Sequence, residues 1–401
     1  MDFALTEEQR ILRENARRFL EREIAPHVQE QESKGPMDRG TAGVLIKKLV
    51  DFGFVMGPFP PEIGGNGLDE QSHGVMTEEL WRVWPALGVM VLVDPAPVEG
   101  AIASGNEGLA QRVVLPILRG EKLGCGAITE PNVGSNPRAV ETTAVREGDH
   151  YVVNGTKMWI TNGGVADFVM CLCKVKGEPG LSQLIIEKEA SPFTTRELDK
   201  LGLKASPTSE LHFEDCRVPV GNRVVPESGL KQTLKGFERA RAMLAIGAVG
   251  ISQACLEAAL TYAGERKQWG KTLAGHQTIQ HMIDDPAHDC RDGHTHRRRP
   301  LPRLPRFLRH GPGPEGRERD LDGQVLLLRE RSQGFLPGSP GPRRVRAFER
   351  VPAGTVLPGR AHPHDPRRHK RDPEDDRSPG AAQGERVLRA LRTPVNPPLP
   401  S

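Results

Sequence analysis

The spacing of apolar residues divides the chain into helical, β-rich and helical parts. Up to about residue 120, apolar positions recur at helical spacing in four runs, at 11–20, 44–54, 76–84 and 109–118. Thr6, with Gln9 three residues later, forms a capping-box pattern just before the first run. We therefore expect residues 1–120 to form an N-terminal helical domain.

From residue 121 the apolar period shortens toward two, as in a β-strand. Short runs rich in β-branched residues alternate with Gly, Pro, Asn and Asp up to residue 226, which predicts an antiparallel sheet or a small barrel. Asn154–Gly155 is typical of a hairpin turn. Helical spacing returns from Leu230 to Ile283 with a long apolar face that should be buried, so 227–284 reads as the start of a C-terminal helical domain.

The composition changes near Asp284. After Ile283 the chain has no Ile, Met, Trp or Tyr, and Pro and Arg are dense. Such a stretch buries too little apolar surface to offset the entropy of ordering it. The predicted fold class is therefore α+β multidomain: an N-terminal helical domain, a central antiparallel β domain, a truncated C-terminal helical bundle and a disordered tail at 285–401.

Charge and cysteine content restrict the function classes. Lys and Arg number 55 against 52 Asp and Glu, and this net charge of +3 over 401 residues does not favour a nucleic acid or a membrane as partner. No uninterrupted apolar run approaches the length of a membrane span, and the acidic start MDFALTEEQR differs from a cleaved signal, so we expect a cytoplasmic chain. Six scattered cysteines without CxxC spacing indicate reduced thiols rather than disulfides or a zinc site.

Two segments of the β-rich part could hold a ligand. In ITEPNVGS, 128–135, Thr129 and Ser135 offer hydroxyls and a glycine allows close backbone approach, although an ordinary turn explains the same residues. In NGTKMWITNGG, 154–164, strand alternation places Trp159 and Thr161 on one face, where an indole could cover a planar cofactor. A core tryptophan is the simpler alternative.

A third segment, GERKQWGKTLAGHQTIQ, follows the long helical run at 264–280. Arg266 offers a guanidinium fork for a pyrophosphate, and amides and a flat indole accompany it in Gln268, Trp269 and Gln277. Taken alone, the segment reads equally as a solvated basic helix end.

Together, the three segments resemble the acyl-CoA dehydrogenase family of flavoproteins. LPILRGEKLGCGAITEP overlaps the first segment, and FERARAMLAIGAVGISQACLEAALTYAGERKQWGK leads into the third, so the resemblance covers nearly all of 1–284. It implies that the isoalloxazine ring of FAD would contact Ile128, Thr129, Trp159 and Thr161. It also implies that Ser135 lies near the cofactor and the thioester. The family forms homotetramers, and the phosphate and adenine side of FAD in a neighbouring subunit would contact Arg266, Gln268, Trp269 and Gln277.

The resemblance implies a reaction and a carboxylate base. Family members convert an acyl-CoA to a trans-2-enoyl-CoA and pass electrons to electron-transfer flavoprotein. Their base is usually a Glu in a Glu-Gly-Thr segment near the carboxyl terminus; some instead place it just before the arginine that matches Arg241, where this chain has Ala240. Glu238 and Arg241 would then be substrate-side contacts, with Glu238 as a substitute base.

No Glu-Gly-Thr segment is present after Ile283, and the codons suggest why. Joining the last two bases of each codon to the first base of the next allows Gly359 to Asp376 to encode Asp-Ala-Arg-Thr-Leu-Thr-Ile-Pro-Asp-Gly-Thr-Ser-Glu-Ile-Gln-Lys-Met-Ile. This string resembles the missing family segment, with Asp at the base position. We therefore expect a frameshift near Asp284.

Two other interpretations of the tail remain. The chain could be a non-enzymatic remnant that binds flavin or CoA weakly and whose arginines, 297–309, bind nucleic acid. Potential metal ligands also occur at His288, Cys290, His294 and His296, but their spacing matches no standard metal cage, and we expect no metal site.

Overall fold

The computed structural model of the protein describes residues 5–55, 57–224 and 229–284. The expected tail, its arginines and its potential metal ligands lie outside these residues. The N-terminal part consists of helices, as the apolar spacing predicts. They are α1 (Glu7–Glu23), α2 (Ala25–Lys34), α3 (Arg39–Phe52), α4 (Glu70–Val83), α5 (Pro85–Val93), α6 (Ala96–Ser104) and α7 (Glu107–Leu118).

Side-chain caps fix where several of these helices begin. The capping box before α1 is confirmed, because the Thr6 hydroxyl accepts from the backbone N–H of Gln9 while the Gln9 side chain accepts from that of Thr6. Asp38, Asp69 and Asn106 accept hydrogen bonds from the third residue after them at the starts of α3, α4 and α7. Each cap satisfies an amide that the helix itself leaves without a partner.

The β domain is one seven-stranded sheet with the neighbour order β1-β4-β2-β3-β7-β6, and β5 pairs with β4. Most neighbours are antiparallel, as expected, but β4 runs parallel to both β1 and β2. The strands are β1 (Gly124–Ala127), β2 (Thr143–Glu147), β3 (His150–Thr161), β4 (Phe168–Val175), β5 (Ser182–Glu187), β6 (Thr194–Glu197) and β7 (Thr208–Pro219).

The hairpin turn predicted at Asn154–Gly155 is wrong. Both residues lie inside β3, and the turn between β2 and β3 lies at Gly148–Asp149, where Gly148 has a φ of 61°. Asn154 is instead paired with Asp215 on β7: its side chain accepts from the Asp215 backbone N–H at 2.8 Å and donates to the carboxylate at 3.1 Å. The Asn-Gly pair thus marks a register shift between β3 and β7 rather than a turn.

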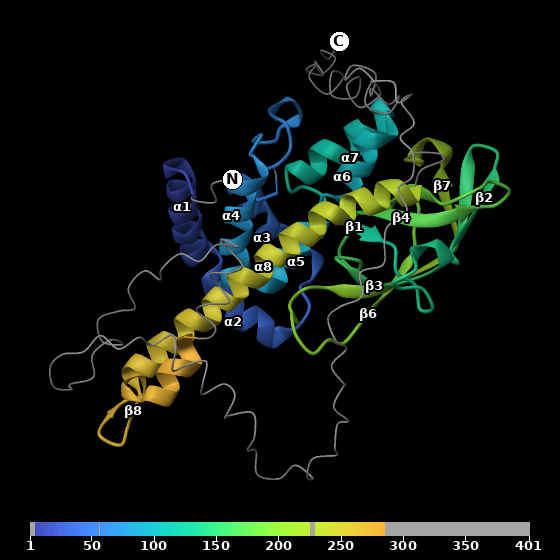
Figure 1. The fold of residues 1–401 in the computed structure, drawn as a ribbon. Helices are drawn as coiled ribbons and strands as arrows, with labels where there is room; N and C mark the ends of the chain where they lie inside the picture. Colours follow the sequence, from blue (N-terminus) through green and yellow to red (C-terminus); the bar gives the residue numbers. More distant parts are fainter. Residues whose placement is uncertain (1–4, 56, 225–228, 285–401) are drawn as a thin grey trace, which may run out of the picture. The chain divides into compact units, whose positions relative to one another are not determined.

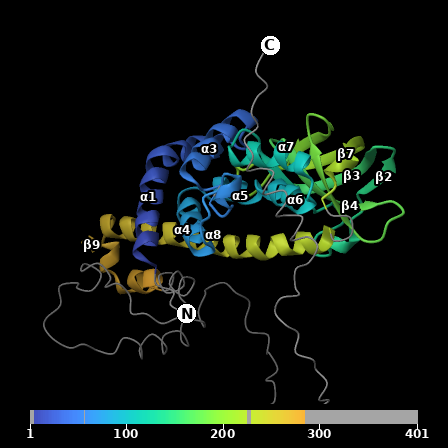
Figure 2. The ribbon, with the colours of Figure 1, turned by 90° about the horizontal axis from the view of Figure 1, so that it is seen from above.

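Helix α8 (Gly229–Glu265) passes beside the N-terminal helices and reaches the β domain, as Figure 1 and Figure 2 both show. It contacts α4 through two glycines. A Cβ on Gly247 would come within 2.4 Å of the Trp81 ring, and one on Gly250 within 2.3 Å of a backbone carbonyl of α4. Only glycine therefore permits this approach.

Two expectations about this region need correction. Helical structure is not continuous to Ile283, because a hairpin of β8 (Lys267–Gln268) and β9 (Lys271–Thr272) separates α8 from a helix at 277–284. The apolar face is also only partly buried: Met243 is buried, whereas Leu244 is 42% exposed. Most of α8 away from α4 is thus open to solvent.

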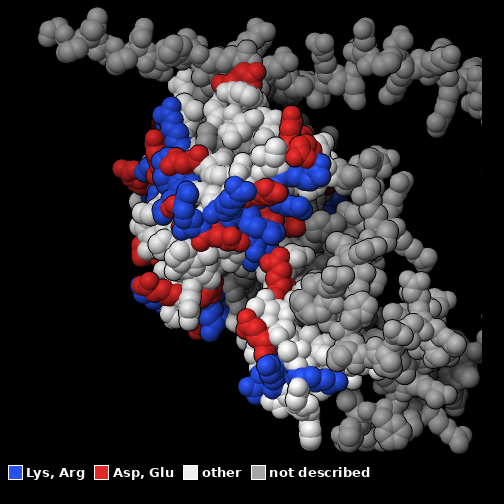
Figure 3. Space-filling view, turned by 90° about the vertical axis from the view of Figure 1, so that its left-hand side faces the viewer, with Lys and Arg blue, Asp and Glu red and all other residues white. Residues whose placement is uncertain are grey.

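A charged network joins α8 to α1 and α4. Glu79 is buried and forms ion pairs with Arg17 and Arg82, both at 2.8 Å. Arg82 also reaches Glu257 on α8 at 3.1 Å and Glu21 on α1 at 2.9 Å. Elsewhere on the face shown in Figure 3, positive and negative side chains alternate without a large area of one sign.

Two described segments pass the length and composition criteria for a membrane span, Pro85–Ser104 and Gly236–Glu265. Neither is an uninterrupted apolar run. The first contains Asp94 and Glu99, and the second contains Arg241 and Glu257. More than half of the apolar window in the first segment is buried inside the fold, and core helices of soluble proteins meet the same criteria.

The described cysteines are free thiols. Cys125, Cys171, Cys173 and Cys216 are buried, and Cys255 on α8 is exposed. Burial raises the pKa of Cys171 to about 11 and that of Cys216 to about 12, so these thiols stay protonated at neutral pH. The four buried cysteines therefore act as core residues.

Asp94 joins α5 to the start of the sheet. It is fully buried, and its Oδ1 accepts from the Gly124 backbone N–H at 2.7 Å, while Oδ2 has no partner among the described residues. Burial raises the pKa of Asp94 to about 7, which the Gly124 bond only partly opposes. The folded chain therefore holds a proton that the unfolded chain loses near pH 4.

This proton makes stability depend on pH. Between about pH 4 and pH 7 the unfolded state binds fewer protons than the folded state, so the free energy of unfolding falls as pH rises and levels off above pH 7. Asp94→Asn should reduce this fall and be more stable than the parent at pH 8 by about 1 kcal/mol or more. Urea unfolding from pH 4 to pH 8 measures the difference, and the exposed Asp199→Asn is the control. Equal pH slopes for parent and Asp94→Asn would contradict a protonated Asp94.

Candidate active site

The loop that begins with Ile128 is held by a buried ion pair. Lys157 on β3 and Glu130 have side chains that are 0% and 1% exposed, and Nζ lies 2.8 Å from Oε1. Nζ also donates to the backbone carbonyls of Ile128 at 3.1 Å and Leu172 at 2.6 Å. One ammonium group thereby fixes the loop against β3 and β4.

Glu130 completes the arrangement from the other side. Its carboxylate accepts from the backbone N–H groups of Glu141 and Thr142 at 2.5 and 2.9 Å and from the Thr142 hydroxyl. Burial would raise the pKa of Glu130, but the bonds from Lys157 and Thr142 outweigh it and lower the pKa. The pair is therefore charged, fully hydrogen-bonded and rigid.

Trp159 lies at a bulge in β3 beside this pair. Between Lys157 and Ile160 the pairing with β7 shifts by one residue, and Trp159 has a left-handed φ of 61°. Its side chain is 53% exposed, Ile160 is buried, and Thr161 is partly exposed. Trp159 and Thr161 thus lie on the open face as strand alternation predicts. Strained backbone at an exposed aromatic residue is a recurrent feature of functional sites.

The loop and this strand are joined by a backbone bond. The Met158 N–H donates to the Thr129 carbonyl at 2.9 Å. Ile128 and Thr129 are half-buried, whereas Ser135 is exposed farther along the loop. The sequence segments around 128 and 159, which lie far apart in the chain, therefore form one surface.

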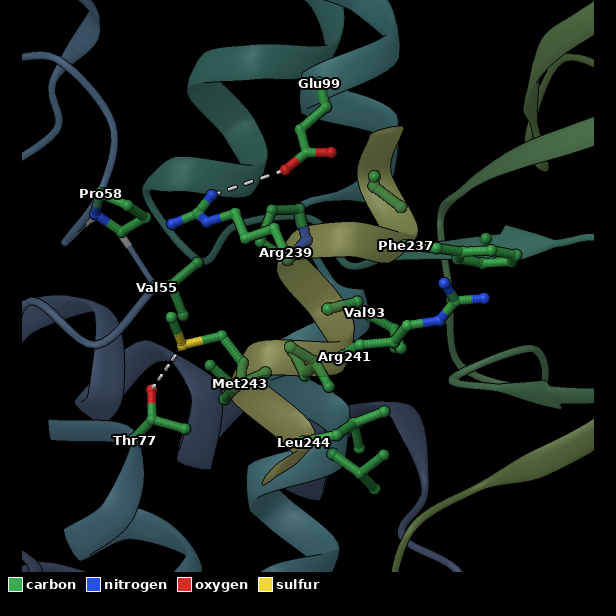
Figure 4. Close-up of a pocket in the computed structure, with 18 of the residues that line it drawn as sticks. Val55, Pro58, Thr77, Val93, Glu99, Phe237, Arg239, Arg241, Met243 and Leu244 are labelled. Atoms are coloured by element: carbon green, nitrogen blue, oxygen red, sulfur yellow. Dashed lines mark hydrogen bonds and ion pairs between the residues drawn. The ribbon is translucent and has the colours of Figure 1, made fainter. Parts of the chain in front are cut away.

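A cavity of about 480 Å³ opens between this surface, helices α4 to α6 and α8. Its wall is mostly apolar; members include Phe54, Val55, Pro58, Phe59, Leu80, Trp81, Val91, Val93, Met170, Phe237, Met243 and Leu244. Ile128 and Gly126 form its boundary with the sheet. Figure 4 shows that many of these side chains come from α8 and the helices opposite it.

The first turns of α8 are attached to β5 at the cavity wall. Gln183 donates to the Thr233 hydroxyl at 2.7 Å, and the Gly229 N–H donates to the Leu181 carbonyl at 3.1 Å. Both Gln183 and Thr233 line the cavity. These bonds set the position of α8 relative to the sheet.

Polar side chains gather at the cavity end nearest α4. Arg239 of α8 lies 3.2 Å from Glu70 on α4 and 3.6 Å from Glu99 on α6. His73 on α4 also lines this end, and burial together with the Arg239 charge lowers its pKa. Figure 4 shows Arg239 and Arg241 extending to opposite sides of α8.

The substrate-side residues suggested by the resemblance are placed unequally. Arg241 lines the cavity, and its guanidinium lies 5.8 Å from the centre of the Phe237 ring. Ala240 also lines it. Glu238 is exposed and is not among the described lining residues. Glu238 is therefore poorly placed to act as a base inside this cavity.

The third predicted segment lies at the other end of α8. Arg266, Gln268, Trp269 and Gln277 are all exposed, and Trp269 forms the β8–β9 turn with Gly270, with φ values of 54° and 76°. At 1.5 Å per residue, α8 separates this hairpin from Phe237 by about 40 Å. One chain thus cannot bring it to the surface formed by Ile128 and Trp159.

Sequence reasoning missed the residues that position the site. Lys157 and Glu130 lie inside the two segments that were identified, and a lysine on the inward face of a strand was the available signal. No sequence signal indicated the contact between Glu99 and Arg239, because it joins α6 to α8 across 140 residues.

The described residues fit a flavin only in part. An exposed indole, a nearby hydroxyl and the edge of a rigid loop suit the face of a planar ring with polar edges. The guanidinium and amides that suit a pyrophosphate lie on the distant hairpin. A single chain therefore offers the ring side of such a site, and a second copy of the chain would have to offer the phosphate side.

Comparisons with known proteins agree with this architecture. Three family models match the chain: acyl-CoA dehydrogenase N-terminal domain at 6–121, middle domain at 125–216 and C-terminal domain at 227–294. The chain belongs to the acyl-CoA dehydrogenase family. Its match to the short-chain-specific acyl-CoA dehydrogenase of Clostridium acetobutylicum is 38% identical over 293 residues, 71% of this chain and 76% of the relative. Glutaryl-CoA dehydrogenase of Desulfococcus multivorans is 34% identical over 291 residues, 71% of this chain and 74% of the relative.

Solved acyl-CoA dehydrogenase structures share the fold. Butyryl-CoA dehydrogenase of Megasphaera elsdenii matches with a TM-score of 0.67 and 30% identity, covering 73% of this chain and 78% of that chain. A glutaryl-CoA dehydrogenase of Mycobacterium smegmatis in complex with FADH2 matches with a TM-score of 0.67 and 26% identity, covering 72% and 74%. The helical, β and helical order expected from the sequence is thereby confirmed.

The ion pair predicts a large and specific loss of stability. Lys157→Met leaves the Glu130 charge buried without its partner, which should cost about 3–5 kcal/mol. Removing both charges in Lys157→Met with Glu130→Leu should recover part of this loss, because no lone buried charge remains. Urea unfolding measures both variants, with the exposed Lys204→Met as control. A Lys157→Met variant as stable as this control would show that the ion pair does not hold the loop.

Proposed function

We propose that this chain carries the flavin and acyl parts of an FAD-dependent acyl-CoA dehydrogenase but lacks its general base. Its reaction is the α,β-dehydrogenation of an acyl-CoA to a trans-2-enoyl-CoA, and this activity is impaired in the chain as it stands. The observation that carries the proposal is the apolar cavity between the Ile128 loop and α8.

The cavity suits an acyl chain. A wall of aliphatic and aromatic side chains takes a hydrocarbon out of water, which is the main favourable term in binding it. Ile128 lies where the cavity meets the sheet, next to the face that carries Trp159 and Thr161. A chain bound there has its reacting carbons beside the proposed flavin face.

The one carboxylate among the described cavity residues, Glu99, is not a suitable base. Glu99 is the single Asp or Glu among the described residues that line the cavity, and it faces Arg239 at 3.6 Å. Its carboxylate is thus held in an ion pair rather than left free to accept a proton. Removal of an α proton needs a positioned base of suitable pKa. We therefore place the base outside the described residues.

The missing part is encoded in the second reading frame. The C-terminal family model stops matching at residue 294, and the relatives above are matched over about three quarters of their length. The alternate-frame string from Gly359 to Asp376 supplies the absent segment. We infer that a frameshift near Asp284 has replaced it, and that an Asp serves as base in the restored chain.

FAD, when bound, accepts the hydride from the β carbon. Ile128, Thr129, Trp159 and Thr161 support the ring, and Ser135 lies near the cofactor and thioester. The distant hairpin serves a second subunit in a homotetramer, where its phosphate and adenine contacts are Arg266, Gln268, Trp269 and Gln277. The reduced enzyme passes its electrons to an electron-transfer flavoprotein in the cytoplasm.

We expect this chain to bind FAD weakly. The ring side of the site is present, but the C-terminal part that joins subunits in the proposed tetramer is replaced, so FAD should bind below one per chain and dissociate on gel filtration. Absorbance at 450 nm against protein concentration measures the ratio. A stable tetramer with one FAD per chain would contradict the proposal.

We expect this chain to catalyse the dehydrogenation slowly or not at all. Without a base the chain lacks a contribution of roughly 100 to 10,000-fold in rate. We expect anaerobic bleaching of flavin by an acyl-CoA to be absent or very slow with the chain as it stands, and fast with the frame-corrected chain. In the corrected chain, replacing the restored Asp by Asn should remove most of the rate while FAD stays bound. Equal, rapid bleaching by both chains would contradict the proposal and make Glu99 the base to test.

A further inference from the structure

Two buried polar atoms at the α4 end of the cavity have no partner among the described residues. They are Nη2 of Arg239 and Nδ1 of His73, and both residues line the cavity. We propose that they form a subsite for an uncharged oxygen on the acyl chain, so that the substrate class is an acyl-CoA with a hydroxyl group remote from its thioester. This inference rests on the acyl-CoA function proposed above.

The position of Arg239 is fixed by its other nitrogens. Nε lies 3.2 Å from Glu70 and Nη1 lies 3.6 Å from Glu99, so two helices hold the guanidinium from two sides. The planar fork then gives Nη2 a set direction. Figure 4 shows Arg239 beside Pro58 and Glu99, on the side of α8 away from Arg241. The remaining donor is therefore preorganised.

His73 contributes a neutral ring. Burial lowers its pKa most, and the nearby positive charge of Arg239 lowers it further, so the imidazole is uncharged at neutral pH. A neutral imidazole has one donor and one acceptor nitrogen. His73 and Arg239 line the same cavity.

The surrounding charges decide which group fits. Glu70 and Glu99 carry two negative charges against one positive charge on Arg239, and His73 is neutral. A ligand carboxylate would add a third negative charge beside these two carboxylates, which is unfavourable. A hydroxyl oxygen can accept from Nη2–H and donate to an imidazole nitrogen without adding charge.

The wall next to these two atoms is mostly apolar. Val55, Pro58 and Met243 are apolar, and the Thr77 hydroxyl already donates to the His73 backbone carbonyl at 2.9 Å. A plain hydrocarbon chain that fills this end would leave both polar atoms without partners. A site that is built to bind a hydroxyl discriminates against the analogue that lacks it.

The test compares matched thioesters on the full chain. Isothermal titration with saturating FAD would give dissociation constants for hexanoyl-, octanoyl- and decanoyl-CoA, for their terminally hydroxylated counterparts and for the dicarboxylic esters of equal length. At the length that reaches the subsite, we expect the hydroxylated ester to bind about tenfold or more tightly than the plain ester. The dicarboxylic ester should bind more weakly than either.

Two variants test whether Arg239 and His73 cause the preference for the hydroxylated ester. Arg239→Met keeps the apolar stem and removes the donor, and His73→Phe removes the imidazole; each should abolish the preference for the hydroxylated ester while the plain ester still binds. Arg112→Met is the matched control, because Arg112 also forms an ion pair, with Glu187 at 3.1 Å, but lies outside the cavity lining. It should keep the preference.

Other results would overturn the inference. Equal binding of plain and hydroxylated esters at every length would show that the two atoms bind only water. Tightest binding of a dicarboxylic ester would show that Arg239 recognises an anion. Absence of binding by the plain esters as well would contradict the proposed function itself, which separates that failure from the failure of the subsite alone.

Discussion

The buried ion pair between Lys157 and Glu130 is the constraint on which the candidate site depends. It joins β3, β4 and the Ile128 loop, because Lys157 donates to the backbone carbonyls of Ile128 and Leu172 and Glu130 accepts from the backbone N–H of Thr142. A buried pair of this kind contributes little net stability compared with an apolar pair, but breaking it is costly. Its role is to permit one arrangement of the loop, in which Ile128 lines the cavity and the Thr129 carbonyl accepts from the Met158 N–H, next to Trp159 in β3.

Helix α8 carries this constraint to the rest of the chain. Its first turns are bonded to β5, its middle approaches α4 through Gly247 and Gly250, and its end carries the hairpin with Trp269. A straight helix keeps the two ends far apart. The same element therefore forms one wall of the acyl cavity and separates the ring-side residues from the hairpin, which makes a site shared between subunits the natural arrangement.

Local signals in the sequence predicted the elements well. The Thr6 capping box, the four apolar runs and the change of period near residue 121 depend on neighbours in the chain, and they hold in the structure. The Asn154–Gly155 turn failed because register with β7, a tertiary property, overrides the local preference. Leu244 was expected to be buried, but periodicity shows which face is apolar and not what covers it.

The same division applies to the site. Trp159 and Thr161 could be placed on one face because strand alternation is local. Lys157 and Glu130 could not be paired, and neither could Arg239 and Glu99, because these contacts depend on how loops and helices pack. The polar end of the cavity therefore could not be predicted from the sequence, because its residues come together only in the folded chain.

The described residues that line the cavity offer no suitable base, and the alternate-frame string supplies the missing family segment. Both support a shift of reading frame near Asp284. Determination of the coding DNA tests it most directly. If the frame has shifted, the bases spanning codons 359–376, read in the second frame, spell the string that contains Ile-Pro-Asp-Gly-Thr, and an open second frame extends upstream toward codon 284. Synonymous codons that give a different string, or stop codons that interrupt the second frame, would contradict it.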